Sequence, residues 1–169
     1  VDSRVEKRRC ELLGKEFETN TCGKCFIIDY KGRNQVTVMF YDPVFVVNCQ
    51  MHDLGRGKVG NPFYSTVFDV GYVGVGKYKT NLGVVHTREH ALWVNMLTRV
   101  YDYKNRDKYP TYKDVTVCKE WLNFQNFAAW CHKQEFFNVR DENGKVYQLD
   151  KDILTKDSKV YSPETCCFV

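Results

Sequence analysis

The sequence predicts an α+β fold in which a small β-rich part precedes a part built on two helices. Three observations support this class. Short apolar segments separated by turn residues fill most of the first 70 residues, a helical repeat of apolar residues follows at 93–101, and 43% of all residues are hydrophobic. That content is ample for a packed core, so the 169 residues should form one ordinary domain or two small ones.

The first part is predicted to be a charged lead over residues 1–14, followed by a small SH3-like β-barrel over residues 15–70. The lead is expected to be a short helix or a solubilising tail, with a basic arm on nucleic acid as the alternative. Apolar segments of strand length alternate with turn residues along 25–30, 31–34, 36–41, 42–43 and 44–48. Strands this short must curl upon themselves to bury one face, which favours a barrel of about five strands.

Two glycine-rich segments allow more than one interpretation. The basic segment 55–62 is either a flexible connection or a contact to a phosphate backbone, and contact is slightly favoured. Residues 71–76, Gly-Tyr-Val-Gly-Val-Gly, superficially resemble a phosphate-binding loop, but no βαβ unit surrounds them. Alternation of glycine with apolar residues favours a strand that other backbone approaches closely.

The second part, residues 71–169, is predicted to be an α/β region with two helices and a C-terminal β-hairpin. The first helix is capped by Thr87, and its buried face is formed by Trp93, Met96, Leu97, Val100 and Tyr101. Pro110 and a high density of polar residues predict a loop from Asp102 to Lys113.

After a short strand at 115–118, a second helix is expected with Asn123 as its cap and Phe124, Phe127, Ala128 and Cys131 as its apolar face. Trp121 and Trp130 are interpreted as core residues. Asn143-Gly144 is a turn signal, and the hairpin should pair residues 147–154 with residues 159–169.

Positive charge is concentrated between Lys77 and Lys113. This stretch carries eight Lys or Arg against three carboxylates, a local net charge of +5 in a chain whose total is +4. Aromatic rings interleave with the basic side chains, an arrangement that offers phosphate contacts and flat surfaces for sugars or bases. The alternative is the solvated face of an ordinary domain. The candidate DNA-binding residues are Lys77, Lys79, Arg88, Asn95, Arg99, Lys104, Arg106, Lys108 and Lys113.

No apolar run approaches the length of a membrane span, and the first residues lack the core of a signal peptide, so a cytosolic or nuclear protein is expected. The eight cysteines are then expected to be reduced. Cys22 and Cys25 have the spacing of half a zinc site, but no second half follows. The last four residues formally fit a prenylation box, although a strand end explains them better. We therefore expect no metal and no cofactor.

A series of short motifs runs from His86 to Val169: Trp93-x-x-Met96-x-x-Arg99-x-Tyr101, Tyr109-x-x-Tyr112-Lys113, Val115-x-Val-Cys118-x-x-Trp121, Phe124-x-x-Phe127-x-x-Trp130, Leu149-Asp150-x-Asp152 and Tyr161-Ser-Pro-Glu-Thr-Cys166. This series resembles a family of bacteriophage HNH-type homing endonucleases and related phage DNA-binding proteins. Residues 57–72 look like the amino-terminal part of many of those proteins. The resemblance implies double-stranded DNA as the ligand and the cytoplasm of a bacterial host cell as the compartment.

Cleavage does not follow from the resemblance. An HNH site needs a histidine base and ligands for a divalent metal ion, and here Asp150 and Asp152 stand at the metal position with no histidine beside them. They could in principle hold Mg²⁺. Because no helix that would bring the remaining ligand is found before Val169, we expect both aspartates to be turn or packing residues.

These observations lead to one main hypothesis and two alternatives. The main hypothesis is a double-stranded DNA-binding protein derived from a phage homing endonuclease, without nuclease activity, that acts as a sequence-specific transcriptional repressor. The first alternative is an active metal-dependent endonuclease or nickase that uses Asp150 and Asp152. The second is an interaction module whose β-barrel binds a partner peptide. Pairing of two copies as a homodimer on a palindromic site is left open.

Overall fold

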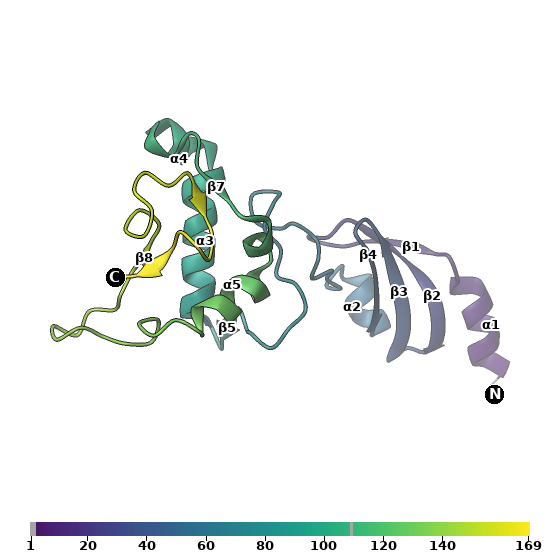
Figure 1. Cartoon of the computed structure of the whole chain (residues 1–169). Coiled ribbons are helices and arrows are strands. Elements are labelled where there is room, and N and C mark those ends of the chain that lie inside the picture. The colour runs from purple at the N-terminus through teal and green to yellow at the C-terminus, as the bar shows by residue number, and fades with distance from the viewer. Residues whose placement is uncertain (1–2, 109) are drawn as a thin grey trace. The chain divides into compact units, whose positions relative to one another are not determined.

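The computed structural model describes residues 3–108 and 110–169, without the side chains of Asn105 and Arg106. The chain divides into two compact units, Val1–Tyr64 and Ser65–Val169 (Figure 1). The boundary predicted from the sequence was after residue 70, with residues 1–14 as a separate lead. Helices and an antiparallel sheet are both present, so the α+β class is confirmed.

The first unit is an antiparallel four-stranded sheet in the order β1-β2-β3-β4, accompanied by two helices. Its elements are α1 (Ser3–Leu12), β1 (Glu16–Glu18), β2 (Lys24–Gly32), β3 (Gln35–Tyr41), β4 (Val44–Cys49) and α2 (Met51–Gly55). The three predicted strands are confirmed, and the lead forms α1, which packs against β2 (Figure 1).

The sheet is open, and the predicted SH3-like barrel is not found. Among the described strands, β1 pairs only with β2 and β4 pairs only with β3, so both remain edges. Closure is unnecessary because helices cover one face of the sheet. Leu12 of α1 and Leu54 of α2 join one buried cluster with strand residues such as Ile27, Val38 and Phe40.

The glycine-rich segment 55–62 is built into the first unit. Val59 and Asn61 are buried, the amide of Asn20 donates to the carbonyl of Gly57 at 2.9 Å, and the Asn61 side chain donates to the carbonyl of Pro43 at 2.8 Å. This segment is therefore not a flexible connection. Its predicted phosphate contact stays a prediction.

The second unit is arranged around α3, the longest helix in the described part of the chain. Its elements are β5 (Asn81–Leu82), β6 (Val85–His86), α3 (Arg88–Tyr101), α4 (Tyr103–Lys108), η1 (Pro110–Tyr112), β7 (Thr116–Val117), η2 (Lys119–Leu122), α5 (Phe124–Cys131), β8 (Leu149–Asp150), β9 (Val160–Tyr161) and β10 (Cys167–Phe168). Both predicted helix caps are confirmed. The Thr87 side chain accepts from the amide of His90, and that of Asn123 accepts from the amide of Gln125.

One local prediction in this unit is wrong, and another is confirmed only in part. The segment from Asp102 to Lys113 is not a loop but contains α4 and η1, because the Asp102 carboxylate accepts from the amide of Lys104 at 3.0 Å and starts a new helical turn. In the C-terminal region, β8 pairs antiparallel with β10, whereas β9 pairs in parallel with β7. The hairpin prediction missed the second pairing because the partner strand is distant in sequence.

The core of the second unit contains the predicted apolar faces of both helices. Trp93, Met96, Leu97 and Val100 are buried with Trp121 in one cluster, so the helical periodicity is confirmed. The core also contains a buried polar contact, in which the Trp93 indole N–H donates to the carbonyl of Trp121 at 2.7 Å. Trp130 is half-buried against this cluster. None of the helices in residues 3–108 and 110–169 combines the length and apolar character needed to cross a bilayer.

The glycines of segment 71–76 lie where other atoms approach the chain. A Cβ added at Gly74 would lie 2.2 Å from Oδ1 of Asn123, and one at Gly76 would lie 2.2 Å from Oε1 of Gln125. Gln125 also holds the segment, since its side chain bonds both the amide and the carbonyl of Tyr78. The glycines are thus closely approached, but by side chains rather than by the backbone that was predicted. The expected strand is reduced to two isolated bridges, one between Gly71 and Val67 and one between Tyr72 and Asn123.

Candidate nucleic-acid interface

Helix α3 exposes a stripe of small and polar side chains opposite its buried face. Ala91, Asn95 and Arg99 recur every four residues and are all exposed. Residues at this spacing lie one above another on a helix. The stripe therefore presents a small apolar residue, an amide and a guanidinium, which are groups that contact thymine methyls, adenine and guanine or phosphate in DNA complexes.

The predicted lysines lie at the two ends of this helix. Exposed Lys77 and Lys79 precede it, and Lys79 is tied to its amino end because the Thr87 hydroxyl donates to the Lys79 carbonyl at 2.9 Å. Exposed Lys104 and Lys108 lie on α4 at the carboxyl end, and exposed Lys113 follows η1 (Figure 1). The side chain of Arg106 lies outside the described residues. Tertiary structure thus separates the basic stretch into two groups.

The side chain of Arg88 makes contacts inside the second unit. Its guanidinium donates to the carbonyl of Tyr147 and lies 4.8 Å from the ring centre of Phe137 and 5.6 Å from that of Phe168. Burial is the main cause that lowers its pKa from the ordinary value. Arg88 therefore joins α3 to the C-terminal segments, and the helical wheel alone gave no sign of this role.

Arg99 lies beside the buried Tyr161. Burial raises the pKa of the Tyr161 phenol to about 12, and hydrogen bonding to Arg99 opposes that rise. With that pKa the Tyr161 phenol stays protonated at neutral pH. Arg99 therefore combines a contact to β9 with an exposed position on the stripe.

Asp150 and Asp152 have the contacts of turn residues. The Asp150 carboxylate accepts from the amides of Asp152 at 2.7 Å and Ile153 at 3.0 Å. Asp152 pairs with the buried Lys151, whose ammonium group lies 2.6 Å from it and 2.7 Å from the carbonyl of Ser158. Within residues 3–108 and 110–169, no three His, Cys, Asp or Glu side chains are grouped so that they could hold a metal ion.

Cys22 and Cys25 serve different parts of the first unit. The Cys22 sulfur accepts from the amide of Asn61 at 3.3 Å, which fixes the glycine-rich segment. Cys25 is fully buried in the sheet core, and burial raises its pKa to about 11. Both cysteines therefore have structural contacts in the first unit, Cys22 through a hydrogen bond and Cys25 through burial in the core.

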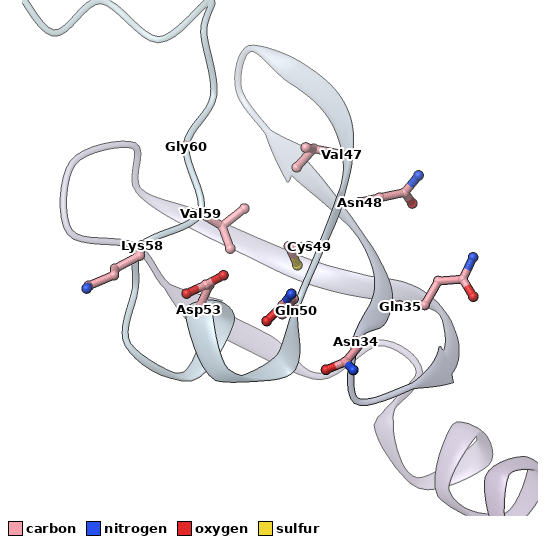
Figure 2. A pocket seen from close by; sticks show the side chains of 10 residues that line it. All are labelled: Asn34, Gln35, Val47, Asn48, Cys49, Gln50, Asp53, Lys58, Val59 and Gly60. Carbon is pink, nitrogen blue, oxygen red and sulfur yellow. The ribbon is translucent and has the colours of Figure 1, made fainter. Parts of the chain in front are cut away.

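A pocket of about 460 Å³ lies on the first unit between β4, the turn before β3 and the segment that follows α2. Its lining includes four amide side chains, one carboxylate and one ammonium group, from Asn34, Gln35, Asn48, Gln50, Asp53 and Lys58. Figure 2 shows Cys49, Gln50, Asp53 and Val59 close together at its centre. Because the charges of Asp53 and Lys58 balance, the pocket has no positive field that would favour a phosphate.

His90 adds a pH-sensitive group at the amino end of α3. Its ring lies 4.9 Å from that of His86 and 5.3 Å from that of Phe124, and its buried Nδ1 has no hydrogen-bond partner among the described residues. Burial, followed by the charge of His86, lowers the pKa of His90, while Glu89 opposes the shift.

The unfolding free energy of the second unit is expected to fall in mild acid because of this histidine. The unfolded chain binds a proton near the ordinary pKa of 6.5, and the folded chain resists it, so stability is full above that pH and declines as pH drops through the lowered pKa. Urea unfolding at about pH 7.5 and about pH 5.5 measures the loss. His90→Asn should reduce the difference between the two pH values, and an unchanged difference would assign it to other groups.

The hairpin formed by β5 and β6 is a candidate site that was not predicted from the sequence. The structure pairs Asn81 with His86 and Leu82 with Val85 in a stretch for which no strand was predicted. The sequence feature that could have indicated this hairpin is a glycine inside a short apolar run, Leu82-Gly83-Val84-Val85.

A scan of protein-family models, a search of curated proteins and a search of solved structures each gave no match to this chain.

Proposed function

We propose that the Ser65–Val169 unit binds double-stranded DNA through α3 and the cationic groups at its two ends. The observation that carries this proposal is the exposed stripe of Ala91, Asn95 and Arg99 on a helix whose opposite side is fixed in the core. An α-helix fits the major groove of B-form DNA, and Asn and Arg side chains form bidentate bonds to base edges there. The packed face keeps the stripe in one orientation.

The lysine groups suit phosphates on either side of such a helix. The 14 residues of α3 span about 21 Å, a length close to that of six base pairs. Lys77 and Lys79 precede the helix, and Lys104, Lys108 and Lys113 follow it. Cations at both ends would fix the register of α3 without reading sequence, which leaves specificity to Asn95 and Arg99.

The contacts of Asp150 and Asp152 favour a protein that binds DNA without cleaving it. The Asp150 carboxylate is occupied by backbone amides and Asp152 by Lys151. Together with the resemblance to phage homing endonucleases, this supports a protein that has kept the DNA ligand of such enzymes and acts by occupying its site. A repressor that blocks an operator in a bacterial host cell is the corresponding biological role.

Salt dependence tests the binding proposal. Affinity for duplex DNA should fall steeply with salt, and Lys104→Gln should make the slope of log K against log salt shallower by about 0.9, the value for one lost phosphate contact. Lys145→Gln removes an exposed lysine outside the proposed set and should leave the slope unchanged. Fluorescence anisotropy with a labelled duplex measures both. Affinity that is independent of salt would exclude the proposal.

A plasmid assay separates binding from cleavage. Supercoiled DNA incubated with the protein and Mg²⁺ or Mn²⁺ should remain intact, because neither aspartate is arranged as an open ligand. Nicking that disappears in Asp150→Ala would establish the nuclease alternative instead. Footprinting on genomic fragments, with and without the metal ion, would report the bound site and whether its symmetry requires a homodimer.

A further inference from the structure

The hairpin of β5 and β6 exposes an apolar tip. The exposed fraction is 69% for Leu82, 65% for Val85 and complete for Val84. Single exposed apolar residues are ordinary on protein surfaces, but three among four consecutive residues at the end of a projecting hairpin are not. None of the three side chains belongs to a buried cluster. The apolar tip is therefore available to contact a ligand.

The hairpin is fixed at its turn and at its base. Gly83, the first of the two turn residues, has a φ of 66°, the positive value that a type II′ hairpin turn requires. At the base, the amide of Thr87 donates to the carbonyl of Thr80 at 2.9 Å. The ring of His86 also contacts the Asn81 side chain. The apolar tip is thus held in place before any ligand arrives.

The chain segment that carries the tip is positively charged. Residues 71–88 contain Lys77, Lys79 and Arg88 but no carboxylate. Both lysines are exposed, and the chain that carries them leads directly into β5. An exposed apolar tip preceded by two exposed lysines complements an apolar interior bordered by phosphates. Stacked base pairs between two DNA backbones have this character.

We propose that Leu82 and Val84 enter the minor groove of bound DNA and wedge between adjacent base pairs, so that the duplex bends while Lys77 and Lys79 neutralise the flanking phosphates. This inference rests on the proposed DNA-binding function and adds to it a mode of recognition. Apolar wedges of this type unstack one base step and are favoured at flexible pyrimidine–purine steps. The protein would therefore select sites by deformability as well as by the contacts of α3.

Bending can be measured by energy transfer between dyes on the two ends of a duplex of about 40 base pairs with a central TA step. Binding of the wild-type protein should raise the transfer efficiency. The variant Leu82→Thr/Val84→Thr keeps β-compatible side chains and both lysines. It should lose most of that rise and on the order of tenfold in affinity, with an unchanged salt slope.

The matched control is Ile153→Thr, which replaces another exposed apolar residue, 61% exposed, outside the hairpin. It should bend DNA as the wild type does, and tryptophan fluorescence should show that all variants remain folded. DNA binding with no rise in transfer, or an equal rise in the double variant, would overturn the wedge but not the binding function. Absence of any duplex binding at low salt would remove both.

Vesicles of phosphatidylcholine and phosphatidylserine separate DNA from a membrane surface as the ligand of the tip. Cosedimentation should be weak and equal for the wild type and the double variant. Strong cosedimentation that the double variant loses, together with unchanged DNA bending, would assign the tip to a lipid surface and overturn the proposal.

Discussion

Replacement of Trp93 with alanine is expected to destabilise the Ser65–Val169 unit by about 3–5 kcal/mol, the largest effect of any single change considered. Trp93 is fully buried on α3, and its indole N–H satisfies the carbonyl of Trp121. The substitution leaves a large cavity and an unpaired buried carbonyl, and both raise the free energy of the folded state. Trp93→Phe keeps most of the volume and should cost less, about 2 kcal/mol.

Tryptophan fluorescence during urea unfolding is a selective measurement here, because Trp93, Trp121 and Trp130 all belong to the second unit. Hydrogen exchange of β2 and β3 provides the control, since the buried cluster of the first unit is separate from that of the second. Protection in these strands should be retained in Trp93→Ala. A loss of stability below about 1 kcal/mol would show that Trp93 is not central to the core.

The second large effect is expected for Gly71→Ala. An added Cβ would lie 2.5 Å from Cδ1 of Leu97 and 3.0 Å from Cζ2 of Trp93, so the methyl group cannot enter without displacing core side chains. Overpacking of this kind costs about 1–3 kcal/mol. Gly60→Ala is the matched control, because a Cβ there meets no atom within 4 Å, and its unfolding midpoint should stay near that of the wild type.

The double variant Gly71→Ala/Leu97→Val tests whether the loss of stability arises from the contact between the new methyl group and Leu97. Leu97→Val removes the atom closest to the new methyl group, so Gly71→Ala should cost less in the Leu97→Val background than in the wild type. Additive losses in the two single variants and the double variant would mean that the added methyl group does not meet Leu97, and that Gly71 is required for another reason.

Elements defined by local pattern were predictable from the sequence. The alternation along 25–48 gave three strands, and the spacing of Trp93, Met96, Leu97 and Val100 gave the buried face of α3. Both caps were correct because a capping side chain bonds an amide two or three residues away. Errors occurred where distant segments decide the structure, as in the open sheet and the parallel pairing of β9 with β7.

The residues of the candidate interface also separate into those that were predictable from local pattern and those that were not. The sequence by itself determined that positive charge gathers around α3 and that Asn95 and Arg99 lie opposite its apolar face, because helical periodicity depends only on residue order. Only the tertiary structure decided that Arg88 packs against Phe137 and that Leu82 and Val84 stay outside every core. Burial depends on which remote segments cover a side chain, and spacing along the chain does not contain that information.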